Sequence, residues 1–272
     1  MEKTFGVLWG DRRAEELVRL FRQDGYTVSA YDGHTAETLQ GVFGADILFL
    51  PVPLFDASGA LNCPGAPMSA GELLSCLRPG QTVLAGQVPA DFMRQAHEKG
   101  VALTDFMTES MTVANAALTA DAALSLTLTE TAQTLAGKRC LVLGFGRIGK
   151  ILCQRLHGMG ADVTAAARNP VDRAWIRALG FTALDTSRLS GHLRSVQVVY
   201  NTIPTPVLDA ERLREFPPEC FLMDLASRAG IDHGAASRLG LTCLWARGLP
   251  GRVFPRSAAV LLRDTAYHLL SK

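Results

Sequence analysis

The stretch "VLGFGRIGKIL", Val142–Leu152, decides how the second half of this chain folds. Its glycines, Gly144, Gly146 and Gly149, have the spacing G-x-G-x-x-G. The apolar run "CLVLG" leads into them, and "RIGKILCQRLHGMG" follows with apolar side chains at helical spacing. A second apolar run, "ADVTAAAR", comes next. The order strand, glycine turn, helix and strand predicts the start of a dinucleotide-binding βαβ unit.

Each glycine of this motif has an expected physical role. Gly144 allows the tight turn, Gly146 lets the backbone approach a pyrophosphate, and Gly149 lets the helix pack closely on the strand. The helix N-terminus offers free N–H groups to the phosphates. A glycine-rich turn without a ligand is the alternative, and the complete βαβ context favours the ligand. We therefore expect a cofactor to contact the whole turn: Gly144, Phe145, Gly146, Arg147, Ile148 and Gly149.

The end of the next predicted strand indicates which dinucleotide binds. An NAD site usually has an acidic residue there, which binds the ribose hydroxyls. This strand ends "TAAARNP" and has no carboxylate. Ala167 leaves space, and Arg168 supplies a planar cation suited to the 2′-phosphate of NADP. We expect Ala167, Arg168 and Asn169 to contact NADP, although a solvated loop arginine remains the alternative.

Two further predicted strand ends carry polar residues. The first, "NTIPTP", places Asn201 and Thr202 where they could bind the nicotinamide ribose, and Pro204 stiffens the loop. The second, "DLASRAG", places Ser227 and Arg228 beyond a buried strand. Ligands in open α/β sheets bind at the carboxyl ends of strands, so both ends extend the predicted cofactor site: Asn201, Thr202, Ile203, Pro204, Leu225, Ala226 and Ser227. The preceding Asp224 is more typical of a buried carboxylate that binds backbone N–H groups than of a catalytic group.

Arg228 and a third strand end form the predicted substrate site. The stretch "ARGLPGRVFP" (residues 246–255) is typical of an ordered, tightly turned loop that could offer backbone N–H donors to a substrate. The substrate-binding residues that we expect in it are Gly248, Leu249, Pro250 and Gly251. Arg228 is the one residue to which we assign a catalytic role, because bidentate pairing of arginine with a carboxylate fixes a substrate's orientation.

The chain as a whole alternates apolar runs with amphipathic helical patterns. Such alternation predicts an α/β fold with two lobes, each a mostly parallel sheet with helices on both faces. The C-terminal lobe is then a Rossmann NAD(P)-binding domain. We expect an N-terminal lobe over residues 1–108, a linking helix over 109–136, or two helices that abut, the cofactor domain over 137–254, and a C-terminal helix over 255–272 that packs back on the N-terminal lobe.

Composition excludes several classes of protein. Hydrophobic residues make up 48% and charged residues 19% of the chain, and the net charge is +1, so nothing indicates nucleic-acid or membrane binding. We expect no membrane-spanning segment, and the first residues are typical of a strand rather than a signal peptide. The cysteines form no C-x-x-C pair. We expect buried, reduced thiols, no metal site and a cytoplasmic protein.

Several stretches together resemble one family. "VLGFGRIGK", "AAARN", "NTIP", "DLASRAG" and "GLPGRVFPRSA" are similar, in order and spacing, to the dehydrogenase-like A subunits of dipicolinate synthase. "WGDRR" (Trp9–Arg13) and "LFLPVP" (Leu48–Pro53) also resemble stretches of that family. The resemblance covers nearly the whole chain, and "DLASR" with "GLPG" is its most specific part.

The resemblance implies a reaction and a partner. Members of the family oxidise dihydrodipicolinate, or its hydroxylated precursor, to dipicolinate with NADP⁺ as the hydride acceptor. A flavoprotein-like B subunit is the partner, the substrate lies between the two lobes, and the product accumulates in bacterial endospores. The region "FMTESMTVAN" (Phe106–Asn115) departs from the family pattern, because it lacks the expected Pro and Gly.

Two other functions stay open at this point. A 2-hydroxyacid dehydrogenase would need a histidine as general base, and His233 and His268 are the candidates. An NADPH-binding sensor or scaffold without turnover would also keep the glycine motif. Homo-oligomerisation is compatible with all three interpretations.

Overall fold

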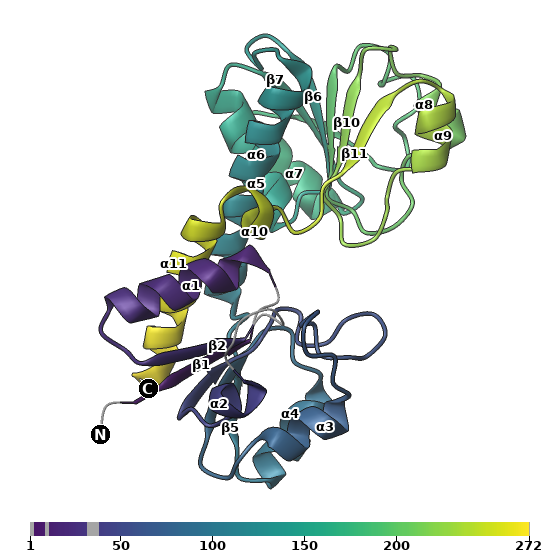
Figure 1. Cartoon of the computed structure of the whole chain (residues 1–272). Helices are drawn as coiled ribbons and strands as arrows, with labels where there is room; N and C mark the ends of the chain where they lie inside the picture. The colour runs from purple at the N-terminus through teal and green to yellow at the C-terminus, as the bar shows by residue number, and fades with distance from the viewer. Residues whose placement is uncertain (1–2, 9–10, 32–37, 272) are drawn as a thin grey trace. The chain divides into compact units, whose positions relative to one another are not determined.

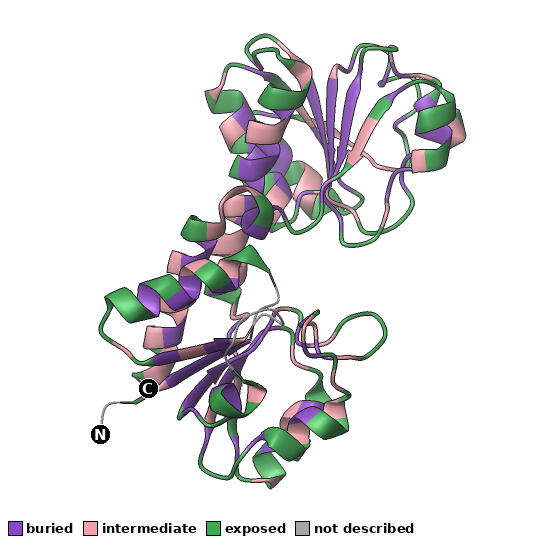
Figure 2. Cartoon of the chain, in the orientation of Figure 1, coloured by how far each residue is buried: buried purple, intermediate pink, exposed green. Residues whose placement is uncertain are grey.

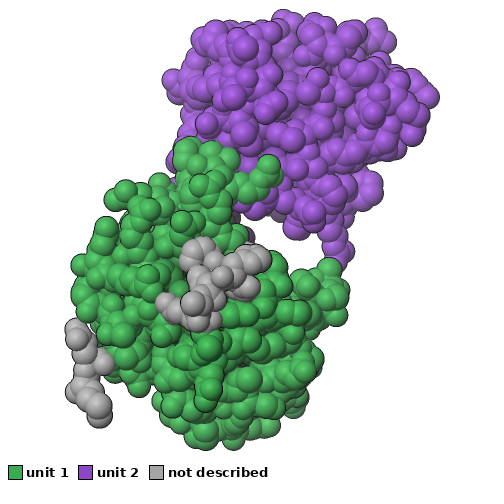
Figure 3. All heavy atoms as spheres, in the orientation of Figure 1, with its two compact units in different colours: residues 1–115, 250–272 green, residues 116–249 purple. Residues whose placement is uncertain are grey.

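The computed structural model describes residues 3–8, 11–31 and 38–271. The chain divides into two compact units, one made of residues 1–115 and 250–272 and the other of residues 116–249 (Figures 1 and 3). Each unit is built on its own parallel sheet. The predicted α/β class with two parallel-sheet lobes is confirmed.

Unit 1 contains a five-stranded sheet in the order β2-β1-β3-β4-β5. Every pairing in it is parallel, as the alternation of apolar runs and helical patterns predicts. The strands are β1 (Phe5–Leu8), β2 (Val28–Tyr31), β3 (Ile47–Phe49), β4 (Thr82–Ala85) and β5 (Ala102–Asp105). The helices are α1 (Arg12–Gln23), α2 (Leu39–Phe43), α3 (Ala70–Cys76), α4 (Ala90–Glu98), α10 (Leu249–Val253), which begins at the last residue of unit 2, and α11 (Pro255–Leu270).

Alternation along the strands creates two cores in unit 1. In β3, Ile47 and Phe49 belong to the core that the sheet forms with α1 and α11. Leu48, between them, belongs to the core on the other face, with α2, α3 and α4. Figure 2 shows the strands buried and the outer helix faces exposed. The C-terminal helix α11 packs against α1, and the hydroxyl of Tyr267 donates a 2.7 Å hydrogen bond to Asp24. The end of the chain therefore belongs to the fold of the first unit.

Unit 2 contains a six-stranded parallel sheet in the order β11-β10-β9-β6-β7-β8. Counted from β6, this is the strand order of a dinucleotide-binding Rossmann fold. The strands are β6 (Arg139–Leu143), β7 (Asp162–Ala166), β8 (Thr182–Leu184), β9 (Val198–Asn201), β10 (Phe221–Asp224) and β11 (Thr242–Trp245). The helices are α6 (Arg147–Gly158), α7 (Pro170–Ala178), α8 (Ala210–Leu213) and α9 (His233–Arg238). The strand β8 was not predicted.

The predicted linking segment, residues 109–136, contains one helix, α5 (Glu109–Thr131), rather than two. By length and composition alone, this helix is apolar enough to cross a bilayer. Its polar groups nevertheless bond inside unit 2. The buried hydroxyl of Thr127 accepts a 2.8 Å hydrogen bond from Tyr200 of β9. We therefore interpret α5 as a core helix.

Two smaller expectations need correction. The stretch 246–255 contains the short helix α10 rather than only a turned loop. Gly248, with a φ of 63°, turns the chain before that helix, and proline is tolerated in a first helical turn. All six cysteines are free, but Cys76 is exposed and Cys243 is only partly buried.

Candidate functional site

In unit 2, the last residues of the six strands are aligned along one edge of the sheet. Register pairs join the last residues of neighbouring strands in a continuous row: Trp245, Asp224, Asn201, Leu143, Ala166 and Leu184. The glycine turn, Arg168, the loop after Asn201 and the loop after Asp224 each follow directly from this row. The three predicted strand ends of unit 2 therefore meet at one carboxyl edge, which is where open α/β sheets bind ligands.

Gly144 and Gly149 are required by sterics. Gly144 has a φ of 95°, and a Cβ atom there would lie 2.3 Å from Oγ1 of Thr202. A Cβ atom on Gly149 would lie 2.1 Å from the carbonyl oxygen of Gly144. The N–H of Gly144 also donates a 2.9 Å hydrogen bond to Ala166, the last residue of β7. These contacts hold the turn against the sheet, as expected from the motif.

Gly146 differs from the other two glycines. A Cβ atom there would meet nothing within 4 Å, so no atom of the described residues explains the absence of a side chain. Gly146 is the N-cap of α6, which has no side-chain capping bond and no acidic residue in its first turn. The first N–H groups of a helix need acceptors, and a phosphate oxygen suits them. The residues present thus fit a pyrophosphate in front of Gly146.

The end of β7 offers space and a cation. Ala167 is buried, and Arg168 is exposed. The guanidinium group of Arg168 has no hydrogen-bond or ion-pair partner in the described part of the chain. The side chain of Asn169 caps α7, because its Oδ1 accepts a 2.9 Å hydrogen bond from the N–H of Val171. This oxygen therefore already has a partner within the protein.

A buried network holds the loops after β9 and β10 together. The carboxylate of Asp224 is fully buried and accepts hydrogen bonds from Asn201 Nδ2 at 2.8 Å and from three backbone N–H groups. These belong to Ala226 at 3.1 Å, Gly230 at 2.8 Å and Ile231 at 3.1 Å. The interpretation of Asp224 as a carboxylate that binds backbone N–H groups is confirmed.

Asn201 belongs to this network rather than to a binding surface. Its side chain has no exposed area. Nδ2 donates to Ile203 O at 3.0 Å as well as to Asp224, and Oδ1 accepts from the N–H of Ile203 at 3.0 Å. The expected contact of this side chain with a ribose therefore needs correction, since the amide is committed to positioning the loop. Thr202 is half-buried and donates to Leu143 O at 2.9 Å.

Position 230 must be a glycine, and the sequence alone did not reveal this. A Cβ atom there would lie 2.3 Å from Nδ2 of Asn201 and 2.5 Å from the carbonyl oxygen of Ile203. Only glycine lets the two loops approach so closely. Pro204 lies exposed at the surface of the first loop, and Leu225 and Ala226 are buried at the base of the second.

Ser227 and Arg228 project from the second loop, and both are exposed. Within the described residues, neither a carboxylate nor a carbonyl group binds the guanidinium group of Arg228. Asp232, four residues further along, does not pair with Arg228; its carboxylate caps α9 by accepting a 2.8 Å hydrogen bond from the N–H of Ala235. Arg228 is therefore a cation available to a ligand.

His233 is backed by a carboxylate, which the sequence did not show. Its Nε2 lies 3.6 Å from Asp224 and is buried without a hydrogen-bond partner among the described atoms. Its Nδ1 lies 3.4 Å from the thiol of Cys243, whose pKa is raised to about 12, mainly by burial. Both ring nitrogens thus face the interior, and a general base needs one that reaches its substrate.

Most of the predicted substrate loop, residues 248–251, is buried rather than exposed. Gly248 is exposed, but Leu249, Pro250 and Gly251 are buried in α10. Within unit 1, a Cβ atom on Gly251 would lie 2.9 Å from Asp11 Oδ2, which belongs to an ion pair with Arg13.

Trp9 and Gly10 of the "WGDRR" stretch lie outside the described residues. Across the described part of the chain, acidic, histidine and cysteine residues form no group suited to a metal.

Comparisons with known proteins show what this chain is similar to. Residues 105–236 match the model of the D-isomer specific 2-hydroxyacid dehydrogenase, NAD binding domain. The A subunit of dipicolinate synthase from Bacillus subtilis (strain 168) is 32% identical over 179 residues, which are 65% of this chain and 60% of that protein. The matched part thus spans less than two thirds of this relative's length.

Two solved structures show the fold over nearly the full chain. The structure of the dipicolinate synthase A subunit from Bacillus halodurans matches with a TM-score of 0.81 and 24% identity, covering 99% of this chain and 98% of that one. D-lactate dehydrogenase from Escherichia coli matches with a TM-score of 0.60 and 15% identity, covering 97% and 95%. The chain is therefore similar to the dipicolinate synthase A subunit of Bacillus subtilis, and its residues 105–236 are similar to the NAD binding domain of D-isomer specific 2-hydroxyacid dehydrogenases.

Proposed function

We propose that this chain is the A subunit of a dipicolinate synthase. It oxidises dihydrodipicolinate, or its hydroxylated precursor, to dipicolinate with NADP⁺, acts in the cytoplasm, and its partner is a flavoprotein-like B subunit. The observation that carries the proposal is the unfilled space in front of Gly146 at an uncapped helix N-terminus. The similarity to the dipicolinate synthase A subunit supports the choice of reaction.

The protein's task in this reaction is mainly to place and hold the substrate. Bound NADP⁺ supplies the hydride acceptor, and formation of an aromatic pyridine favours loss of the hydride and a proton. Gly144, Gly146 and Gly149 would hold the pyrophosphate, and Arg168 the 2′-phosphate. The exposed guanidinium group of Arg228 would bind one substrate carboxylate in a bidentate geometry. Correct placement then lowers the barrier, because it removes the entropy cost of bringing the reactants together.

Preference for NADP(H) should depend on Arg168. We expect Arg168→Ala to weaken NADP(H) binding by about 1.5–3 kcal/mol, the range for a hydrogen bond to a charged group. NAD(H) binding should hardly change, because NAD(H) lacks the 2′-phosphate. Fluorescence titration of both cofactors measures this. Arg194→Ala removes an exposed arginine before β9, at the other edge of the sheet, and serves as the control. Equal affinity of the unmodified protein for both cofactors would contradict the assignment.

Substrate binding should depend on the shape of Arg228 and not only on its charge. Arg228→Lys keeps the charge and loses the bidentate geometry. We expect turnover to fall about 10–100-fold, the effect of losing one charge-assisted hydrogen bond. NADPH affinity should stay within error, and so should the melting temperature, because the side chain is exposed and unpaired within the described structure. A lower melting temperature with intact turnover per folded molecule would instead indicate a stabilising role.

Steady-state formation of NADPH from dihydrodipicolinate, with and without the B partner, tests the proposal as a whole. A 2-hydroxyacid dehydrogenase would instead oxidise a 2-hydroxyacid. Of the two candidate bases for that reaction, His233 has a buried Nε2, and His268 is exposed on α11 of unit 1. Cofactor binding without turnover on either substrate would indicate a sensor or scaffold.

A further inference from the structure

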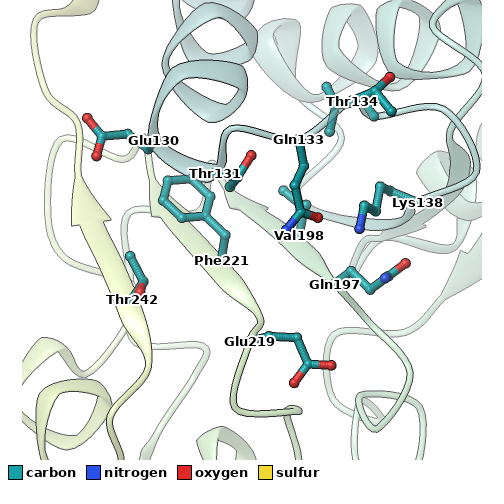
Figure 4. A pocket seen from close by; sticks show the side chains of 11 residues that line it. Glu130, Thr131, Gln133, Thr134, Lys138, Gln197, Val198, Glu219, Phe221 and Thr242 are labelled. Atoms are coloured by element: carbon teal, nitrogen blue, oxygen red, sulfur yellow. The ribbon is translucent and has the colours of Figure 1, made fainter.

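The strand β11 ends in an exposed tryptophan at the carboxyl edge of the sheet in unit 2. The first residue of this strand, Thr242, lines an open hollow at the opposite, amino edge (Figure 4). Its last residue, Trp245, is paired in register with Asp224 of β10. Trp245 is 37% exposed, so packing alone does not account for a tryptophan at this position.

The indole N–H of Trp245 binds the loop that follows β10. Its Nε1 donates a 3.0 Å hydrogen bond to the carbonyl oxygen of Ala226. The N–H of Ala226 donates a 3.1 Å hydrogen bond to Oδ1 of Asp224. Both backbone groups of Ala226 are thus held, one by the buried carboxylate and the other by the neighbouring strand. Ala226 is buried, so its carbonyl group would be left without a partner if the indole N–H were removed, and this is costly.

The tryptophan ring is itself held in place by two neighbours. The ring of His233 is stacked against it, with centroids 5.6 Å apart and an angle of 29° between the planes. The guanidinium carbon of Arg247 lies 4.3 Å from the centre of the tryptophan ring, which is a cation–π contact. These contacts restrict the rotamers of the tryptophan side chain. The indole N–H therefore points at Ala226 in a fixed direction.

Arg228 lies in the middle of a short arch, residues 227–229, which begins directly after Ala226. The arch ends at Gly230, whose N–H donates a 2.8 Å hydrogen bond to Asp224. Within the part of the chain that the structure describes, the three residues of the arch make no hydrogen bond of their own. The place of Arg228 therefore depends on how the two ends of the arch are held.

We propose that Trp245 is a positioning residue for the substrate. Its indole N–H holds the start of the arch, and the arch in turn places the guanidinium group of Arg228. The inference rests on the proposed function, in which Arg228 binds a carboxylate of the substrate. A bidentate pair requires two N–H groups to face two carboxylate oxygens at once, so a small shift of the arch weakens it. Dicarboxylate binding thus depends on Trp245, although the indole does not touch the ligand.

The probe is dipicolinate, the product of the proposed reaction. Its binding to the full chain in the presence of NADPH is measured by isothermal titration calorimetry. Trp245→Phe keeps an aromatic ring against His233 but has no N–H donor. We expect it to weaken dipicolinate binding about 3–10-fold, the effect of one neutral hydrogen bond. Arg228→Ala removes the group that binds the carboxylate, and it should weaken dipicolinate binding about 10–100-fold.

The double variant shows whether Trp245 acts through Arg228. A residue that only positions Arg228 has no further effect once that side chain is gone. We therefore expect Trp245→Phe combined with Arg228→Ala to bind dipicolinate as weakly as Arg228→Ala alone, within about twofold. If the two single effects multiply, the indole contributes independently of Arg228 and the proposal is overturned.

Two controls separate positioning from a loss of stability or of cofactor binding. Trp175→Phe makes the same chemical change on the exposed side of α7, and it should alter neither the melting temperature nor dipicolinate binding. NADPH affinity of Trp245→Phe should stay within error, because the glycine turn and Arg168 bind the charged groups of the cofactor. A loss of NADPH affinity as large as the loss of dipicolinate affinity would overturn the proposal, since the arch would then serve the cofactor.

The unmodified protein separates this inference from the proposed function. If it neither binds dipicolinate nor forms NADPH from dihydrodipicolinate, the proposed function fails, and the inference fails with it. If it binds dipicolinate through Arg228 and Trp245→Phe binds it equally well, only the positioning role of Trp245 is contradicted.

Discussion

A Gly146→Val variant is expected to lose dinucleotide binding while it keeps its fold. The backbone of Gly146 has a φ of −75° and a ψ of −162°, which any L-residue can adopt. A Cβ atom there meets no atom of the described chain within 4 Å, so the valine side chain points into the space that we assign to the pyrophosphate. The fold should lose at most about 1 kcal/mol, because valine is a poorer N-cap than glycine.

The measurements are NADPH titration by fluorescence and the free energy of unfolding in urea. Gly149→Ala is the matched control within the same motif. Its Cβ atom would lie 2.1 Å from the carbonyl oxygen of Gly144, so the turn or the helix must shift. Overpacking of this kind typically costs about 1–3 kcal/mol. We thus expect the change at Gly146 to lower NADPH affinity and the change at Gly149 to lower the free energy of unfolding. Full NADPH affinity in Gly146→Val would mean that the motif is only a structural turn.

The sequence predicted the fold well because the strands are buried and the turns between them are rich in glycine. Within the described residues, every strand except β8 lies in an apolar run, and these runs alternate with helices, a pattern that indicates a parallel sheet. The missed strand, β8 (Thr182–Leu184), has three residues and is only partly buried at the edge of its sheet. So short a segment shows no period of two, and its sequence is indistinguishable from a loop.

The helix α10 was missed for a different reason. Glycine and proline in "GLPG" are typical of loops. Here Gly248 adopts a left-handed φ of 63° before the helix, and Pro250 lies in its first turn, where its missing N–H has no consequence. Composition alone cannot distinguish a turn from a helix start, because both use these residues.

The candidate site was only partly predictable, because position in a strand does not say what a side chain contacts. Asn201 ends β9, which correctly predicted its place at the carboxyl edge. Its partners are Asp224, which is 23 residues away, and Ile203, and these contacts bury the amide completely. The need for glycine at position 230 arises from the same contacts. Such roles depend on how two loops approach each other, and only the three-dimensional structure shows that.

The second large effect is expected for Asp224→Asn. The carboxylate of Asp224 has two oxygens, and each accepts two N–H hydrogen bonds. One accepts from Asn201 and Ala226, and the other accepts from Gly230 and Ile231. An asparagine has one oxygen and one NH₂ group, so in either orientation two N–H donors face another donor. The site has no exposed area through which water could satisfy them.

We expect this single change to lower the free energy of unfolding by about 3–6 kcal/mol, because two hydrogen bonds to a buried charged acceptor are lost. Hydrogen bonds to a charged acceptor are worth about 1.5–3 kcal/mol each, and two are lost. Asp209→Asn is the matched control. Asp209 caps α8 by accepting a 3.0 Å hydrogen bond from Arg212, and asparagine caps a helix equally well. Urea denaturation followed by circular dichroism measures both variants. A loss below about 1 kcal/mol for Asp224→Asn would mean that the loops rearrange without the carboxylate, and that this network does not determine the geometry of the carboxyl edge.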